Sequence, residues 1–101
     1  MNKAKYTQNQ HAILFDCPGC GYLHMVWVKQ PEGGSYPIWE FNGDSENPTI
    51  SPSILVNGNV PINPPHTHRC HSFVRDGKIQ FLSDCTHSLA GQTVELPNID
   101  A

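Results

Sequence analysis

The sequence predicts a small, mainly β single domain: a zinc-ribbon-like antiparallel sheet with long loops and at most one short helix. Three observations lead to this fold class. Short apolar stretches alternate with segments broken by nine prolines and eight glycines, an Asp-Gly pair separates two runs of alternating polarity, and four cysteines occur within only 101 residues. A domain this small buries a modest share of its surface, so a bound metal would add stability that a small core lacks.

The N-terminal third is expected to form two strands joined by a tight turn. Residues 12–15 are apolar, residues 22–28 are rich in β-branched and aromatic side chains, and a Pro-Gly pair lies between them. The polar residues 1–10 are expected to be flexible, because chain ends are loose unless other elements hold them. We therefore divide the chain into a flexible N-terminus and one zinc-stabilised β domain over residues 11–101.

The middle of the chain contains two further candidate strands among irregular segments. Residues 38–41 alternate in polarity, and residues 49–56 predict a strand that Pro52 restricts to a sheet edge or a bulge. Residues 57–65 are expected to be irregular. The Asn-Gly-Asp segment at 42–44 is typical of a turn, and we favour this interpretation over a functional loop.

The strongest local signal is a hairpin over residues 68–83 with an Asp-Gly pair as its two-residue turn. The predicted register places Arg75 opposite Lys78 and brings Cys70 diagonally across from Cys85 on one face. Such diagonal neighbours lie about 7 Å apart by backbone position, which allows two thiolates to bind one metal ion. Two minor elements are expected to follow, a helical turn at 86–91 and a short strand at 93–96.

The Cys-Pro-Gly-Cys segment at 17–20 is typical of a zinc knuckle. Two intervening residues let both sulfurs reach one ion, and the glycine after the second cysteine accommodates the turn. A structural zinc site has four N or S ligands. We therefore predict one structural Zn²⁺ bound by Cys17, Cys20, Cys70 and Cys85. The alternative, a redox dithiol, requires a surrounding βαβ pattern that the sequence lacks.

Histidines leave the choice of the fourth ligand open. His87 and His71 are the leading substitutes, because each lies close to a cysteine that is expected to approach the metal. His24, His66 and His68 are also near in sequence, so a Cys₃His site is almost as well supported as a Cys₄ site.

Charge and composition disfavour several classes of function. The net charge is −3 and the six Lys and Arg residues form no cluster, which argues against binding to a nucleic-acid backbone. We find no apolar run of the length that a signal peptide or a membrane span requires. The metalloprotease H-E-x-x-H and zinc-deaminase motifs are missing. The serines at 51, 53, 83 and 88 have no G-x-S-x-G context, so no serine nucleophile is indicated.

Three longer motifs stand out: WEFNGD at 39–44, NPTISPS at 47–53 and CHSFVRDGKIQFLSDCTH at 70–87. Together with the knuckle, they resemble a family of short bacteriophage and prophage proteins of unknown function, some of which carry an ammonia monooxygenase label. That label has no support here, because the chain has neither the membrane spans nor the copper-type ligands that it implies. The matching positions are Cys17, Cys20, Asn42, Gly43, Asp44, Pro48, Cys70, His71, Asp84, Cys85 and His87.

The resemblance implies a phage context, and we expect a small accessory protein in the cytoplasm of the bacterial host cell. It would act by binding a macromolecule, a host or phage protein rather than nucleic acid, and inhibition of the host or of its defences fits the small size. The alternative is a zinc-dependent hydrolase with an open metal position near His71, Asp84 and His87. A binding module should show four protein ligands on the metal, and an enzyme three plus a water.

Overall fold

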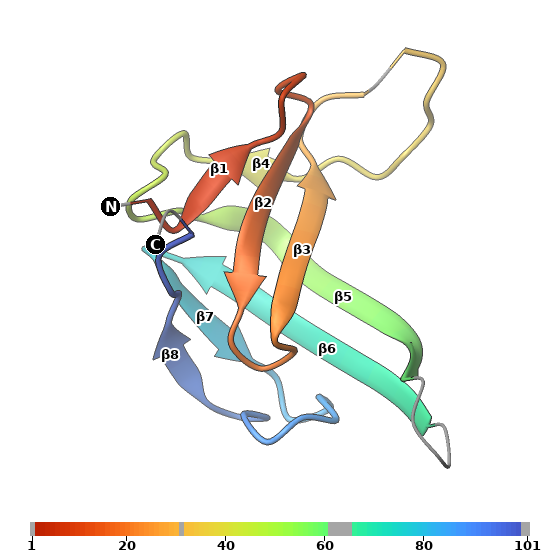
Figure 1. Ribbon diagram of the computed structural model, residues 1–101, viewed down its shortest axis with the longest axis vertical. Coiled ribbons are helices and arrows are strands. Elements are labelled where there is room, and N and C mark those ends of the chain that lie inside the picture. Colours follow the sequence, from red (N-terminus) through yellow and green to blue (C-terminus); the bar gives the residue numbers. More distant parts are fainter. Residues whose placement is uncertain (1, 31, 61–65, 100–101) are drawn as a thin grey trace.

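The computed structural model describes residues 2–30, 32–60 and 66–99, and these form eight strands in two antiparallel sheets (Figure 1). The described residues contain no helix. This confirms the predicted mainly β fold class. The first sheet has the order β1-β2-β3, and its strands are β1 (Ala4–Tyr6), β2 (Ala12–Cys17) and β3 (Tyr22–Trp27). The second has the order β4-β5-β6-β7-β8, and its strands are β4 (Glu40–Phe41), β5 (Ile50–Val60), β6 (His66–Arg75), β7 (Lys78–Phe81) and β8 (Thr93–Glu95).

In the first sheet, β2 and β3 form the predicted hairpin around the Cys-x-x-Cys turn. Cys17 pairs with Tyr22 at the closed end, and the Gly21 amide donates to the Cys17 carbonyl at 2.8 Å. Gly21 has φ of 81°, a conformation that favours glycine, which explains the glycine after the second cysteine. The hairpin thus directs both cysteines of the knuckle towards one end of the sheet.

The N-terminal segment is more ordered than predicted. Residues 1–10 were expected to be flexible, but Ala4 pairs with Phe15 as β1 adds to the edge of β2. Ala4 is fully buried, and the Lys3 amide donates to the Ser45 carbonyl at 2.8 Å. The polar composition of this segment hid the strand, because only Ala4 of its three strand residues is buried.

In the second sheet, the hairpin of β6 and β7 has the predicted register. Arg75 pairs with Lys78, and the turn residues Asp76 and Gly77 have φ of 51° and 77°, as the type I′ turn requires. The predicted strand at 93–96 is confirmed as β8, which pairs with β7. The expected helical turn at 86–91 is instead a series of turns without helix.

Strand β5 is longer than predicted and contains an irregularity. The register with β6 shifts between Ile50 and Ile54, so the segment around Pro52 leaves the regular ladder as a bulge. Regular pairing then continues from Ile54 to Val60, through positions expected to be irregular. The remaining positions of that predicted loop, 61–65, lie outside the described residues. The short β4 covers the other side of β5 only at Ile50 and Ser51.

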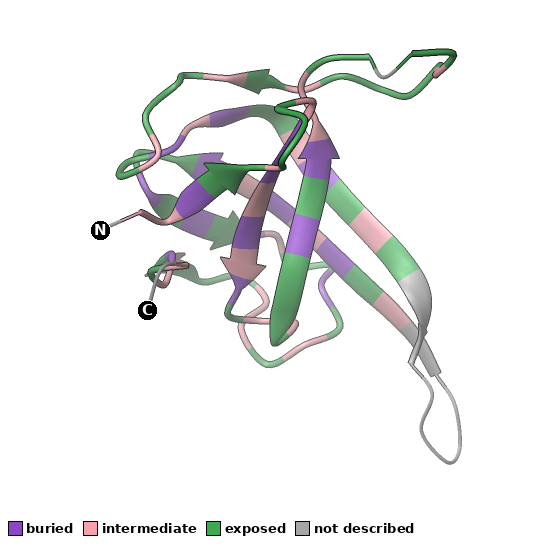
Figure 2. Cartoon of the chain, turned by 45° about the horizontal axis from the view of Figure 1, so that its top comes forward, coloured by how far each residue is buried: buried purple, intermediate pink, exposed green. Residues whose placement is uncertain are grey.

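The two sheets pack against each other, and Figure 2 shows buried and exposed residues alternating along their strands. Phe15 from the first sheet and Phe81 from the second are the largest fully buried side chains. Burying each of these side chains contributes about 2–3 kcal/mol to the stability of the fold. The alternation also gives the second sheet an inner face towards this core and an outer face towards solvent. Each of these faces carries its own cluster of polar side chains.

The Asn-Gly-Asp segment at 42–44 forms the predicted turn. The Asn42 side-chain oxygen accepts hydrogen bonds from the amides of Asp44 and Thr49, both at 3.1 Å, and Gly43 has φ of 81°. In the part of the chain that is described, no helix is long and apolar enough to cross a membrane.

Candidate active site and metal cluster

A chain of hydrogen bonds joins a serine, a histidine and an aspartate on the outer face of the second sheet. The Ser53 Oγ lies 3.1 Å from His71 Nε2, and His71 Nδ1 lies 3.3 Å from Asp84 Oδ2. Because an ionised carboxylate only accepts hydrogen bonds, Nδ1 carries the ring proton and Nε2 is free to accept the proton of the Ser53 hydroxyl. This is the arrangement that activates a serine as a nucleophile.

Sheet register brings Ser53 and His71 together. His71 pairs with Leu55, so the side chains of both lie on the outer face, and Ser53, two residues before Leu55, shares that face. The register of β5 shifts between Ile50 and Ile54, a segment that includes Ser53, and this shift sets Ser53 diagonally across from the histidine. Bulges commonly redirect a side chain next to an active site.

Asp84 comes from the turn that follows β7, and main-chain contacts of His71 hold this turn in place. The Leu82 amide donates to the His71 carbonyl at 2.9 Å, and the His71 amide donates to Cys85 Sγ at 3.2 Å. The Cys85 thiol also donates to the His71 carbonyl at 3.2 Å. Asp84, between Leu82 and Cys85, is therefore fixed beside the imidazole.

The triad is accessible from solvent. The His71 side chain is 27% exposed and that of Asp84 is 42% exposed. Neighbouring Leu55 is 51% exposed, although it is a large apolar residue. A polypeptide could therefore reach Ser53 without a rearrangement of the fold.

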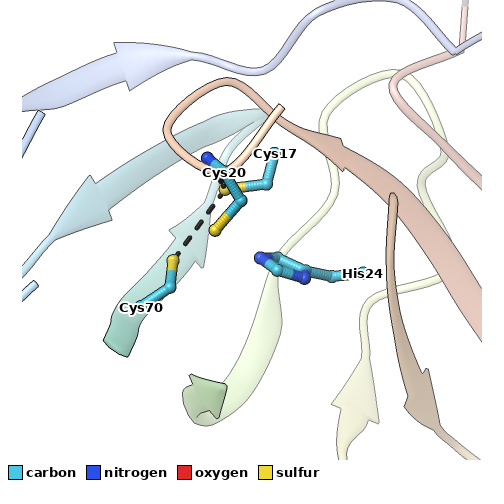
Figure 3. A group of neighbouring side chains, drawn as sticks. All are labelled: Cys17, Cys20, His24 and Cys70. Atoms are coloured by element: carbon cyan, nitrogen blue, oxygen red, sulfur yellow. Dashed lines mark hydrogen bonds between the residues drawn. The ribbon is translucent and has the colours of Figure 1, made fainter. Parts of the chain in front are cut away.

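On the inner face, three cysteines and a histidine converge (Figure 3). Cys17, Cys20, His24 and Cys70 each place a ligand atom within 4.8 Å of the other three. The first three come from the β2–β3 hairpin and Cys70 comes from β6, so the cluster connects the two sheets. The cluster is consistent with a metal site such as zinc.

The geometry of the cluster fits a soft metal ion. The Cys17 and Cys70 sulfurs are 3.9 Å apart, close to the ~3.8 Å that separates two thiolates on a tetrahedral zinc. His24 is only 4% exposed, and its Nε2 is buried without a hydrogen-bond partner among the described residues. A buried ring nitrogen without a partner is costly unless it has a ligand to bind.

The thiols of the cluster also interact strongly with one another. The contact with Cys70 lowers the pKa of the Cys17 thiol, and the same contact raises the pKa of Cys70. Burial raises the pKa of Cys20 to about 11. Three thiols this close cannot all ionise unless a cation compensates the charge, which a bound metal ion would do.

The predicted ligand Cys85 belongs to a second group. Cys85 and His87 lie with Cys70 within 4.8 Å of one another, so the two groups share Cys70. His87 packs edge-on against Phe81 with ring centroids 4.4 Å apart, and its Nε2 is buried without a described partner. Burial lowers the pKa of His87. A β-carbon added at Gly19 would collide with the His87 ring, which explains a glycine at this place in the knuckle.

The predicted substitute ligand His71 lies on the other side of the sheet. Cys70 points into the core, whereas His71 points outwards to Ser53. Adjacent residues of a strand face opposite sides, so one strand supplies one residue to each cluster. Of the other nearby histidines, His68 has its Nε2 3.0 Å from the Cys20 sulfur, and the side chain of His66 lies outside the described residues.

Ser53, His71 and Asp84 are arranged as in the centre of a serine hydrolase, on a small β domain whose other sheet face carries the Cys/His cluster. Comparison with protein families is consistent with this class. Residues 2–82 match the model of BubE, described as the bacterial ubiquitination-like system serine protease. The chain belongs to the BubE family. Neither the curated proteins nor the solved structures that were searched gave a match.

The family match corrects the predicted function. The resemblance to phage proteins was wrong, and with it the interpretation as a phage accessory protein that acts by macromolecular binding. The alternative of a zinc hydrolase is overturned as well, because the family is described as a serine protease. His71, Asp84 and His87 had been selected for that alternative. The structure joins His71 and Asp84 to a serine, whereas His87 lies with Cys70 and Cys85.

Sequence reasoning missed Ser53 for a physical reason. The G-x-S-x-G motif marks a nucleophile on a strand-to-helix turn, whereas Ser53 lies in the bulge of a strand. The available signal was weaker: Pro52 within a strand pattern indicates a bulge, and Ser53 directly follows it. His24 was named only as one of several nearby histidines, and its burial distinguishes it from the others.

Proposed function

We propose that this protein is an active serine protease of a bacterial ubiquitination-like system, with Ser53 as nucleophile, His71 as general base and Asp84 as the residue that orients His71. The observation that carries the proposal is the continuous hydrogen-bond chain from Ser53 through His71 to Asp84. The family description supports the same reaction class. The matched region includes Ser53 and His71 and ends two residues before Asp84.

The geometry accounts for the chemistry of peptide hydrolysis. His71 Nε2 takes the proton of Ser53 as the hydroxyl oxygen attacks the scissile carbonyl, and Asp84 stabilises the imidazolium that forms. His71 then gives the proton to the leaving amine, which leaves an acyl group on Ser53. Water, deprotonated by His71, hydrolyses this ester and restores the serine. Each step uses one proton, and the same ring nitrogen carries it.

The substrate class follows from the reaction and the family description. The substrate is a polypeptide that takes part in the ubiquitination-like system, cleaved at an amide that reaches the outer face of the sheet. The exposed surroundings of Ser53 favour a macromolecular substrate over a small molecule, because small-molecule sites enclose most of their ligand.

We further propose that Cys17, Cys20, His24 and Cys70 hold one Zn²⁺ with a structural role. Four protein ligands leave no open position for catalysis, and a zinc ion there would fix the β2–β3 hairpin to β6. The partnerless Nε2 of His24 favours His24 over Cys85, whose sulfur already bonds the main chain of His71. Since Cys70 adjoins His71, the metal would also stabilise the strand that carries the general base.

Labelling with a biotinylated fluorophosphonate tests the protease proposal directly, because this reagent reacts with activated serines. The purified protein should be labelled, and peptide mapping should place the label on Ser53. Ser53→Ala should abolish labelling, whereas Ser51→Ala, a matched change two residues away, should retain it. Labelling that is absent, or that survives Ser53→Ala, would refute the assignment.

A further inference from the structure

One side of β5 has no strand beside it, and this open edge begins at the candidate nucleophile. Strand β4 pairs with β5 only through Ile50 and Ser51. From Ile54 to Asn57, β5 pairs with β6 on one side, and no strand of the described chain pairs with the other (Figure 1). Unpaired edges of this kind are templates for the addition of an extended chain.

The hydrogen bonds of β6 show which main-chain groups of β5 face the open edge. The amide and carbonyl of His71 bond to Cys85 and Leu82, away from β5. In an antiparallel ladder, paired residues either exchange both bonds or neither. Leu55, the partner of His71, therefore directs its own N–H and C=O to the open edge.

The same reasoning applies two residues further along. The amide of Arg69 donates to Thr86 Oγ1 at 2.9 Å, and its carbonyl accepts from the Thr86 amide at 2.9 Å, so both point away from β5. Asn57, the partner of Arg69, therefore also directs its N–H and C=O outwards. Leu55 and Asn57 together offer two donors and two acceptors with the spacing of a β-ladder.

The edge closes at the nucleophile. The Trp39 indole Nε1 donates to the Ser53 carbonyl at 3.2 Å, so the main-chain acceptor of Ser53 on this side is already used. Beyond Trp39, β4 covers the edge. A substrate strand added at Leu55 and Asn57 must therefore end its pairing at Ser53. If its scissile bond lies at Ser53, only the residues on one side of that bond pair with β5.

We propose that an extended peptide segment of the substrate binds as an additional strand along β5, bonded to Leu55 and Asn57, and that this pairing delivers its scissile carbonyl to Ser53. The inference rests on the proposed protease function and adds the form of the substrate: an unstructured terminus or loop, bound through its main chain. Directly opposite residues of neighbouring strands lie about 4.5–5.5 Å apart by Cα, within reach of a serine Oγ.

The substrate side chains alternate between the two faces of the extended sheet. On the outer face they lie beside Leu55, which is 51% exposed and offers apolar contact. Main-chain bonding gives affinity irrespective of sequence, and this one apolar neighbour gives a preference for an apolar or small residue near the cleaved bond. A folded helix or compact domain has no free main-chain groups and cannot bind in this way.

The test removes one edge donor without disturbing the fold. Proline at an edge position whose N–H faces solvent removes no ladder bond, so Leu55→Pro deletes the donor and leaves the pairing with β6. Leu55→Ala is the matched variant, because it removes the side chain and keeps the N–H. Both are compared with the parent for fluorophosphonate labelling of Ser53 and for cleavage of a proteome-derived peptide library read by mass spectrometry.

We expect Leu55→Pro to retain labelling and to lose cleavage by about tenfold or more, because the substrate carbonyl loses its partner. Leu55→Ala should lose less of the cleavage activity than Leu55→Pro does. If Leu55→Pro is labelled and cleaves like the parent, the edge proposal is wrong and the protease proposal stands. If the parent itself is not labelled, the protease proposal fails and the edge proposal falls with it. A parent that is labelled but cleaves no library peptide also overturns the edge proposal.

A second measurement keeps the proposal testable if Leu55→Pro fails to fold. Synthetic copies of a cleaved library peptide are methylated at single main-chain nitrogens and offered to the parent protein. Edge pairing predicts that methylation prevents cleavage only at every second nitrogen, and only on one side of the scissile bond. Equal tolerance at all positions contradicts it. If Leu55→Pro instead converts a dimer to a monomer with cleavage unchanged, the edge binds a second copy of the chain and the proposal is overturned.

Discussion

The two faces of β6 carry two sites of opposite character, although their key residues are neighbours in sequence. Cys70 points inwards to a buried group of three cysteines and a histidine, and His71 points outwards to Ser53 and Asp84. The inner cluster joins two sheets, whereas the outer one is built on a single sheet and its following turn. The comparison shows how a very small domain places two different polar groups on opposite faces of one strand.

Metal removal should have the largest effect and should damage both sites. Structural zinc contributes about 10 kcal/mol or more to folding, which exceeds the stability of most small domains. We expect a strong chelator, or Cys70→Ala, to unfold the β2–β3 hairpin from β6 and to abolish fluorophosphonate labelling. Circular dichroism and elemental analysis measure the outcome. A metal-free protein that stays folded and labelled would show that the inner cluster is not a structural metal site.

Asp84→Asn should separate the two sites by breaking only the outer one. The amide cannot stabilise an imidazolium as a carboxylate does, so peptide cleavage should fall by up to about 10⁴-fold. Asp84 is exposed, and its replacement should change the free energy of unfolding by no more than about 0.5 kcal/mol. The metal content should stay at the parent value. A fall in stability or in metal content comparable with the loss of cleavage would contradict the separation.

His24→Ala and His87→Ala should sharpen the assignment of the inner ligands. If His24 supplies one of four ligands, its loss removes roughly a quarter of the binding free energy, about 3 kcal/mol or a hundredfold in zinc affinity. His87→Ala should affect the affinity less, because His87 lies in the neighbouring group with Cys85. Competition with a zinc-binding dye measures both. The reverse order of effects would place His87 or Cys85 in the site instead.

The smallest effect is expected far from both sites, at the ion pair of Lys3 with Glu95 that ties the N-terminus to β8. The hydrogen bond from Lys3 lowers the pKa of Glu95 below its ordinary value of 4.5. The pair therefore stabilises the fold above that value, and this stability is lost as the pH falls through the lowered pKa. Glu95→Gln should have a slightly lower melting temperature than the parent at pH 7, and this difference should shrink as the pH is lowered below 4.5. A constant difference would contradict the linkage.

Most of the inner site could be predicted from the sequence, because its signals are local. The Cys-x-x-Cys turn needs only two intervening residues, and the Asp-Gly hairpin fixes the register that carries Cys70. The choice between His24, Cys85 and His87 could not be made, since it depends on which side chains the packing of two sheets buries. The spacing of these residues in the sequence does not show which of their side chains are buried between the two sheets.

The outer site could be predicted only in part. His71 and Asp84 were selected as reactive residues, but their assigned partner was a metal. Ser53 lies 18 residues from His71 in sequence, and Asp84 lies 13 residues from it, with the hydrogen bonds passing between different strands and a turn. A bulge decides the position of Ser53, and no motif in the sequence specifies how a bulge aims a side chain.

The sequence by itself determined the mainly β class, the hairpin turn at Asp76-Gly77, and the presence of a cysteine-rich cluster, because each depends on contacts between residues close in the chain. Only the tertiary structure decided that the N-terminal residues add a strand, that His71 and Cys70 serve opposite faces, and that a serine completes a triad. Those features depend on the register between distant strands. A shift of one residue in that register would exchange the two faces and remove both sites.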